Sequence, residues 1–156
     1  MSSYIESVAS AFTPSGVLSQ ANAQFKPRAG QTEMALAVAE TISTGGELVV
    51  EAGTGVGKTY AYLVPVLLSG QRALVSTATK ALQDQLFSRD IPRLIDAFNL
   101  PIRVALLKGR GSYLCTQRLS QARQSSDASL RIHAHALSKI ENPSQEVVDK
   151  IKKLYF

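Results

Sequence analysis

A run of nine residues combines three glycines with a lysine and a threonine, residue types suited to binding a phosphate chain. The run reads Glu51-Ala52-Gly53-Thr54-Gly55-Val56-Gly57-Lys58-Thr59. Without a Cβ, glycines let the backbone curl and point successive N–H groups at one anion. A lysine ammonium supplies a point charge for the β and γ phosphates, and a threonine hydroxyl is a ligand for Mg²⁺. We therefore predict that residues 52–59 bind a nucleotide, with Lys58 and Thr59 in catalytic roles.

The neighbours of this loop fit such a role. The apolar run at 47–51 predicts a buried strand before it, and residues 58–69 predict a helix after it. A glycine-rich turn between a strand and a helix places the phosphates at the helix N-terminus. The usual pattern begins with glycine, whereas this loop begins with Ala52. The alternative is a glycine-rich strand-to-helix turn followed by a chance Lys-Thr pair.

The remaining elements predict an α/β fold. Apolar runs indicate strands, and periodic apolar residues indicate helices between and before them. Strands are predicted at 47–51, 72–77 and 102–107, and helices at 3–12, 29–43, 58–69 and from about 79 to 98, with an interruption at Pro92. Alternating strands and helices imply a parallel sheet with right-handed crossovers. No strand is predicted after residue 107, where helices are expected at 113–123, 130–140 and 144–154.

Length, hydropathy and cysteine content restrict the class of protein. A chain of 156 residues with 45% hydrophobic residues suits one globular domain. Its apolar runs are shorter than the roughly 20 residues of a membrane helix. We see no secretion signal at the N-terminus. A single cysteine excludes an intramolecular disulfide and favours a reducing cytoplasm.

Charge is distributed unevenly along the chain. Residues 1–102 carry 7 Lys and Arg against 8 Asp and Glu, a net charge of −1, whereas residues 103–156 carry 10 against 4, a net charge of +6. A basic segment of this kind is suited to binding a polyanion. The alternative is a solvated helical face.

Residues that commonly support hydrolysis are sparse. An NTPase needs a carboxylate that holds Mg²⁺ and a group that orients water, and no apolar run ends in Asp-Glu. Asp96 lies in a helical pattern, and we interpret Glu51 as a structural or a loop-orienting residue and not as the base. His133 and His135 are two residues apart, so a shared metal is not expected on a helix. Taken alone, Cys115 is interpreted as a small apolar residue.

Four segments together resemble one helicase family. The loop at 51–59 resembles motif I of superfamily 2 helicases, and residues 76–86 resemble their motif Ia. Residues 25–31 resemble the adenine-reading glutamine motif, and residues 108–115 resemble the segment with the first cysteine of an iron–sulfur cluster. This order and spacing resemble the DinG/XPD family of 5′→3′ DNA helicases, and its YoaA-type bacterial members in particular.

The resemblance implies ATP and Mg²⁺ as cofactors and single-stranded DNA as partner. It implies that Gln31 binds the adenine edge, while the loop and Thr59 hold the phosphates and Mg²⁺. It further implies a P-loop NTPase (RecA-like) fold. Residues expected along the DNA backbone are Thr77, Thr79 and Lys80. Cys115 corresponds to the first of four ligands of a 4Fe-4S cluster in the full-length family, which we do not expect in this chain.

Several family features are absent from this sequence. Three further cluster cysteines, the Asp-Glu-Ala-His motif and the second motor domain are missing, and the segment from about residue 125 to 156 matches nothing in the family. We therefore expect a truncated N-terminal piece with an incomplete sheet and a helical C-terminal segment. Its expected parts are an N-terminal helix and linker (1–24), a partial ATP-binding domain (25–108) and the start of a cluster-like region with a helical tail (109–156).

Three functions remain open. The first is the ATP-binding part of a DNA helicase that is inactive alone. The second is a non-catalytic nucleotide or nucleic-acid binding module, and the third is an unrelated P-loop kinase or small ATPase. In each case a parallel sheet with uncovered edges and faces predicts marginal stability and self-association.

Overall fold

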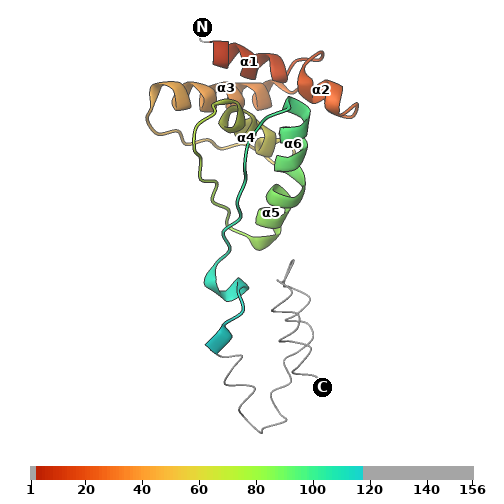
Figure 1. Ribbon diagram of the computed structural model, residues 1–156. Coiled ribbons are helices and arrows are strands. Elements are labelled where there is room, and N and C mark those ends of the chain that lie inside the picture. Colours follow the sequence, from red (N-terminus) through yellow and green to blue (C-terminus); the bar gives the residue numbers. More distant parts are fainter. Residues whose placement is uncertain (1–2, 118–156) are drawn as a thin grey trace. The chain divides into compact units, whose positions relative to one another are not determined.

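The computed structural model describes residues 3–117, which fall into two units divided between Val104 and Ala105. In chain order the elements of the first unit are α1 (Ser3–Ala11), α2 (Val17–Ala21), α3 (Ala29–Thr44), α4 (Lys58–Leu68), α5 (Lys80–Gln85), the π-helix η1 (Leu86–Asp90) and α6 (Ile91–Phe98) (Figure 1). The helices predicted at 3–12, 29–43 and 58–69 are confirmed to within one residue at each end. Helix α2 lies in a polar stretch where no helix was predicted.

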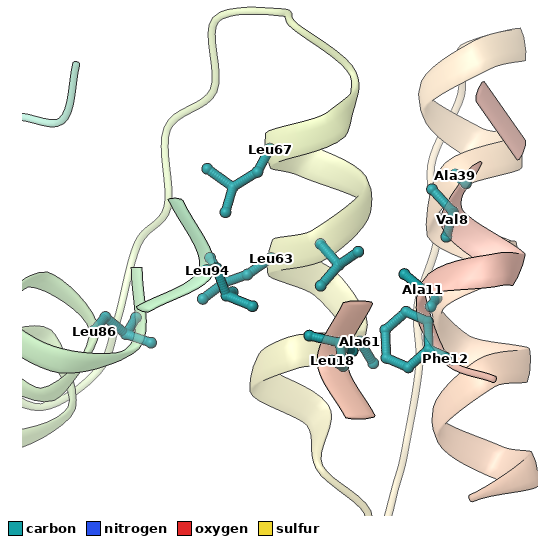
Figure 2. Packing of buried hydrophobic residues seen from close by; sticks show 12 residues of the cluster. Val8, Ala11, Phe12, Leu18, Ala39, Ala61, Leu63, Leu67, Leu86 and Leu94 are labelled. Atoms are coloured by element: carbon teal, nitrogen blue, oxygen red, sulfur yellow. The ribbon is translucent and has the colours of Figure 1, made fainter. Parts of the chain in front are cut away.

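The core of the first unit lies between helices. Helix α3 packs against α4 and α1, and small side chains at these contacts let the helix axes come close. Three of them, Ala35, Ala39 and Ala61, have no exposed surface. Larger apolar side chains fill the remaining space (Figure 2): Val8, Phe12, Leu18, Leu63, Val64, Leu67, Leu86 and Leu94. The helices of the first unit therefore bury their apolar faces against each other.

Helix α4 contains a proline but stays helical on both sides of it. Pro65 is fully buried, and its ring removes one backbone donor from the helix. The hydroxyl of Tyr4 donates a hydrogen bond to the carbonyl oxygen of Pro65 at 2.7 Å. This bond joins α1 to α4, the helix that begins at the glycine-rich loop.

The three segments predicted as strands are not confirmed as a sheet. In residues 3–117, the segments 47–51, 72–77 and 102–107 are neither helical nor paired as strands. Parallel strands need hydrogen-bonded neighbours and cover on both faces. Here Val49 is 97% exposed and Leu74 is 91% exposed. Their apolar side chains thus lack, within the described residues, the layer that would bury them.

A continuous helical run replaces the interruption predicted at Pro92. Helix α5 passes through η1 into α6, with Pro92 in the first turn of α6. A proline ring clashes with the carbonyl four residues earlier in a regular helix, and the wider π turn just before it relieves that crowding. The run ends at Asn99, whose φ of +50° lies in the left-handed region. The predicted interruption is therefore wrong.

The second unit is described over residues 105–117. It contains the 3₁₀-helix η2 (Arg110–Ser112), and the backbone N–H of Lys108 donates to the hydroxyl of Tyr113 at 3.0 Å. Residues 113–115 are not helical, so the helix predicted from 113 begins later, at Thr116. The rest of that predicted helix lies outside the described residues. The same holds for the helices predicted at 130–140 and 144–154 and for both histidines.

Within residues 3–117 no helix has both the length and the apolar character needed to cross a membrane.

Candidate functional site

The glycine-rich loop adopts backbone angles that favour glycine at two positions. Gly55 has a φ of +81° and Gly57 a φ of +90°, both in the region that side chains disfavour. Gly57 is also crowded, because a Cβ placed there would lie 2.3 Å from Nε2 of Gln31. The loop then enters α4 at Lys58, so its curled part lies directly at a helix N-terminus.

Backbone donors in this loop have no backbone acceptor. Across the part of the chain that the structure describes, the N–H groups of residues 53–57 make no hydrogen bond to a backbone carbonyl. Residues 53–55 are exposed, so their N–H groups are accessible to a ligand. Successive N–H groups without protein acceptors in a curled loop form an anion-binding concavity. The N-terminus of α4 adds its own positive dipole end. This arrangement suits a phosphate chain.

The lysine of the loop lies against it. The ammonium of Lys58 donates to the carbonyl oxygen of Ala52 at 2.6 Å and to that of Gly53 at 2.8 Å. Thr54 is exposed and Val56 is half-buried. The positive charge is therefore held beside the same backbone that carries the free N–H groups.

Two side chains at the start of α3 hold the other end of the loop. Arg28 donates through Nη1 to the carbonyl oxygen of Gly55. Gln31, which is only 3% exposed, donates through Nε2 to the carbonyl oxygen of Gly57 at 2.9 Å. The predicted adenine-reading residue is thus joined directly to the predicted phosphate loop.

A pocket of about 350 Å³ opens beside these residues. Its walls come from the segment before α3, the start of α3, the start of α4 and the α5–η1–α6 run. The lining residues are Asn22, Gln24, Phe25, Lys26, Arg28, Gln31, Gly57, Thr59, Tyr60, Gln85, Arg89, Asp90 and Arg93. Two aromatic rings, several amides and four cations give it the means to bind a ring and an anion together. Its volume lies at the lower end of the range for small-molecule sites.

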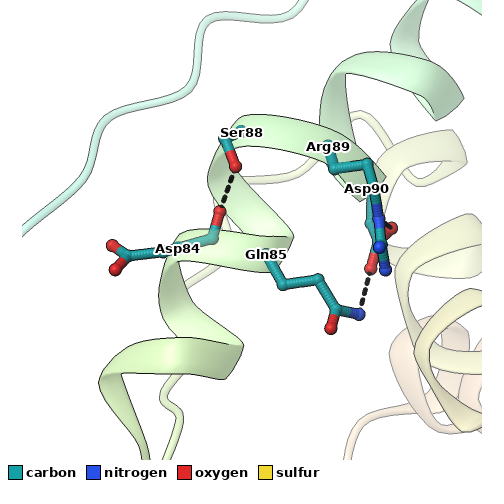
Figure 3. A network of polar contacts seen from close by, with 5 residues as sticks. All are labelled: Asp84, Gln85, Ser88, Arg89 and Asp90. Atoms are coloured by element: carbon teal, nitrogen blue, oxygen red, sulfur yellow. Dashed lines mark hydrogen bonds and ion pairs between the residues drawn. The ribbon is translucent and has the colours of Figure 1, made fainter.

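One wall carries a buried carboxylate with two donors (Figure 3). Asp90 is 4% exposed and accepts from Nε2 of Gln85 at 2.7 Å and from Nε of Arg89 at 2.9 Å. The hydrogen bond with Asp90 raises the pKa of Arg89 above its ordinary value. Burial raises the pKa of Tyr62, a hydrogen bond with Thr59 lowers it, and the charge of Asp90 raises it further.

The predicted site residues are only partly brought together. Gln31, Gly57 and Thr59 line the same pocket. The residues predicted to contact DNA lie at the start of α5, outside the pocket lining. There the hydroxyl of Thr79 accepts from the backbone N–H of Leu82 at 3.2 Å and caps the helix, and Lys80 is exposed.

Cys115 lies in the second unit, and its thiol is free and exposed. Among the described residues there is no group of three or more His, Cys, Asp or Glu side chains that could hold a metal ion. A four-cysteine cluster needs four thiolates, and the sequence contains one cysteine. The residues present therefore do not fit an iron–sulfur cluster.

Motif-based reasoning missed the wall formed by α5, η1 and α6. Gln85, Arg89 and Arg93 recur every four residues, a spacing that puts side chains on one helical face. This row of polar residues could have been noticed in the sequence, since it accompanies the apolar residues of the same helical run. It matches no known sequence motif, however, and only the fold shows that it lies near the start of α3.

Comparison with known proteins identifies relatives for most of this chain. Residues 32–133 match the family described as DEAD/DEAH box helicase. The chain is 51% identical to the ATP-dependent DNA helicase YoaA of Haemophilus influenzae over 118 residues, 76% of this chain and 18% of that protein. It is 54% identical to the ATP-dependent DNA helicase YoaA of Escherichia coli over 110 residues, 70% of this chain and 17% of that protein.

A third relative is the ATP-dependent helicase DinG of Mycobacterium tuberculosis, 50% identical over 108 residues, 64% of this chain and 16% of that protein. This chain therefore spans less than a fifth of the length of these relatives. The family match, in contrast, covers well over half of the chain and includes the glycine-rich loop. From the loop, its neighbouring pocket and this match we conclude that the chain belongs to the DEAD/DEAH box helicase family.

Proposed function

We propose that this chain is the ATP-binding part of an ATP-dependent 5′→3′ DNA helicase of the DinG type. The observation that carries the proposal is the row of backbone N–H groups at residues 53–57 without backbone acceptors, at the N-terminus of α4. Family membership supports it, as does the similarity to the ATP-dependent DNA helicase YoaA and the ATP-dependent helicase DinG.

The loop residues have distinct roles in this proposal. The N–H groups of residues 53–57 and the ammonium of Lys58 bind the phosphates, and the hydroxyl of Thr59 is a ligand of Mg²⁺. Mg²⁺ held by Thr59 would supply positive charge against the negative charge of the phosphates. Gly55 and Gly57 give the loop the curvature that aims its donors at one anion.

Gln31 is the proposed base-reading residue. Its Nε2 is already used by the carbonyl of Gly57, which fixes the orientation of the amide. Its Oε1 accepts no hydrogen bond from another described residue, and an amide oxygen accepts from an exocyclic amine such as that of adenine. Phe25 and Tyr60 line the same pocket and supply apolar surface for a ring.

The fold proposed for this part is a RecA-like parallel sheet built on 47–51, 72–77 and 102–107. Family membership supports it, and the exposed Val49 and Leu74 are apolar residues that a sheet would bury. Amide hydrogen exchange tests it, because paired strands protect alternate N–H groups. Fast exchange throughout 47–51 and 72–77 would contradict a sheet in the isolated chain.

Single-stranded DNA is the proposed partner. Thr77, Thr79 and Lys80 are the proposed backbone contacts, and the exposure of Lys80 leaves its charge available to a phosphate. A DNA substrate and a single cysteine fit the cytoplasm. Because the sequence lacks the Asp-Glu-Ala-His motif, we expect this chain alone to bind ATP without unwinding DNA.

Equilibrium binding of ATP with Mg²⁺ tests the proposal. We expect Lys58→Ala to weaken binding about 10- to 100-fold, the loss of one charge-assisted contact or two. Arg72→Ala is the matched control, since Arg72 is exposed and lies outside the pocket. Equal affinity in Lys58→Ala would refute ATP binding by the loop. ATP turnover stimulated by single-stranded DNA and lost in Lys58→Ala would refute inactivity of the isolated chain.

The alternative is a nucleic-acid binding module that does not use ATP. The net charge of +6 in residues 103–156 favours it. It predicts DNA binding that falls steeply with salt, because counterions are released on binding, and that is unchanged in Lys58→Ala. Salt-insensitive binding, or none, would argue against this module.

A further inference from the structure

We infer that Arg89 binds a phosphate group of the nucleotide, and that Asp90 and Gln85 position it for this contact. The inference rests on the proposed ATP-binding function and extends it to a wall of the pocket outside the glycine-rich loop. The wall belongs to the α5–η1–α6 run, which begins at Lys80, one of the proposed DNA-contacting residues.

Asp90 provides a fixed carboxylate. It is 4% exposed, and its two oxygens accept separately, Oδ2 from Gln85 and Oδ1 from Arg89 (Figure 3). A buried carboxylate is costly unless it is paired and hydrogen-bonded. Because both oxygens are occupied, Asp90 is suited to orienting its neighbours rather than to binding a ligand itself.

Arg89 keeps most of its donors after this pairing. Only its Nε is used by Asp90, and a guanidinium carries four further N–H groups on its two terminal nitrogens. Its side chain is 51% exposed, against 6% for that of Asp90, and it lines the pocket. The hydrogen bond to Asp90 thus holds the Nε side of the guanidinium in place, while the two terminal nitrogens, Nη1 and Nη2, stay accessible.

The charge around the pocket favours an anion. Its lining includes four cationic residues and one carboxylate, namely Lys26, Arg28, Arg89 and Arg93 against Asp90. Since Asp90 is already paired, the lining has an excess of positive charge. A guanidinium fork matches two oxygens of one phosphate group. Phe25 and Tyr60 in the same lining suit a base, which leaves the arginine fork for the phosphates.

The competing explanation is that Arg89 only neutralises Asp90. In that case removal of Arg89 would change the free energy of unfolding, and it would not weaken the binding of ATP more than the binding of adenosine. The two explanations differ in a measurable way, because a positioning role makes the effects of Asp90 and Arg89 depend on each other.

The test measures affinity of the 156-residue chain for ATP with Mg²⁺, and for adenosine as a competitor without phosphates. We expect Arg89→Ala to weaken ATP binding about 10-fold, the size of one charge-assisted contact, with adenosine unaffected. Arg89→Lys restores part of the loss, because it keeps the charge but not the fork. Arg72→Ala, matched in charge and outside the pocket, leaves both affinities unchanged.

A double variant tests the positioning role. Asp90→Asn alone should weaken ATP binding about 3-fold, and Arg89→Ala with Asp90→Asn should bind like Arg89→Ala alone, since Asp90 acts through Arg89. Additive losses would overturn the positioning role. Circular dichroism shows whether each variant keeps its helices, and Arg89→Lys provides the comparison if Arg89→Ala does not fold.

Other outcomes separate this inference from the proposed function. If Lys58→Ala loses ATP binding while Arg89→Ala binds normally, the inference fails and the proposed function stands. If neither variant changes the affinity, the proposed function fails. Equal weakening of ATP and adenosine in Arg89→Ala would show that Arg89 shapes the pocket without binding phosphate, which also overturns the inference.

Discussion

The helices α1, α3 and α4 and the segments 47–51 and 72–77 contain similar apolar residues in opposite surroundings. Leu63 on α4 is 1% exposed, whereas Leu74 between α4 and α5 is 91% exposed. Val8 on α1 is fully buried, whereas Val49, just before the loop, is 97% exposed. Residue type alone therefore does not decide burial in this unit.

The difference lies in where each element finds its partners. Helices make their backbone hydrogen bonds internally, so α1, α3 and α4 need only neighbouring helices to cover their apolar faces. A parallel strand needs both a neighbouring strand and covering layers. Residues 3–104 supply the helices with these contacts but do not pair the two segments.

The largest contrast concerns two leucines. We expect Leu63→Ala to lower the free energy of unfolding by about 2–5 kcal/mol, because it leaves a cavity among the helices. Leu74→Ala should change it by less than about 0.5 kcal/mol, because the side chain is exposed. Urea unfolding followed by far-ultraviolet circular dichroism measures both. A similar loss in the two variants would show that residues 72–77 are packed in solution, and would contradict the contrast between Leu63 and Leu74.

The second prediction concerns the loop that joins 47–51 to α4. Gly57→Ala should lower the free energy of unfolding by about 1–3 kcal/mol, because φ is positive there and the new Cβ meets Gln31. Gly53→Ala is the control, since its φ is not positive and its Cβ would meet nothing within 4 Å. The same unfolding assay applies. If Gly57→Ala is neutral, the loop is not held by Gln31.

The third prediction concerns the boundary between 72–77 and α5. Thr79→Ala should cost about 1 kcal/mol, because the hydroxyl caps the helix through the N–H of Leu82. Thr77→Ala is the comparison; its hydroxyl donates to the carbonyl of Thr79 at 3.3 Å, a long bond between exposed groups. We expect it to cost less. Equal costs in the unfolding assay would mean that the cap is not what begins α5.

The smallest expected effect involves the contact between α1 and α4. Tyr4→Phe should cost about 0.5–1 kcal/mol by removing the hydrogen bond to Pro65. Burial raises the pKa of Tyr4 above its ordinary value of 10.0. The proton is therefore held more tightly in the folded state, so this contribution is complete below pH 10 and is lost as pH rises further.

The pH dependence gives this prediction a second measurement. The urea concentration at the unfolding midpoint should decrease as the pH is raised above 10. In Tyr4→Phe this decrease with pH should be less steep. Tyr60→Phe serves as the control variant, because Tyr60 lies on α4 and, within the described residues, makes no hydrogen bond to α1. An unchanged slope in Tyr4→Phe would assign the pH dependence to other groups.

Sequence reasoning located the helices of the core and the loop, because their signals are local. Glycine at 57 and lysine at 58 mark where α4 begins, and apolar spacing marks α1 and α3. The strands at 47–51 and 72–77 could not be decided locally, since the same apolar run fits a paired strand or an unpaired segment. The pocket wall formed by α5, η1 and α6 was not predicted, because these residues form a pocket only together with the start of α3, which is distant in sequence.

The π turn at η1 has a consequence for tolerance to insertion and deletion. A π turn holds one residue more than an α turn. Loss of one residue from 86–90 would therefore convert this segment into an α turn and leave the direction of α6 nearly unchanged, with Leu94 still in the core and Arg93 still in the pocket. Loss of one residue from a regular α-helical turn would instead rotate everything after it by about 100°. A deletion is therefore tolerated better in the π turn than in the helices on either side of it.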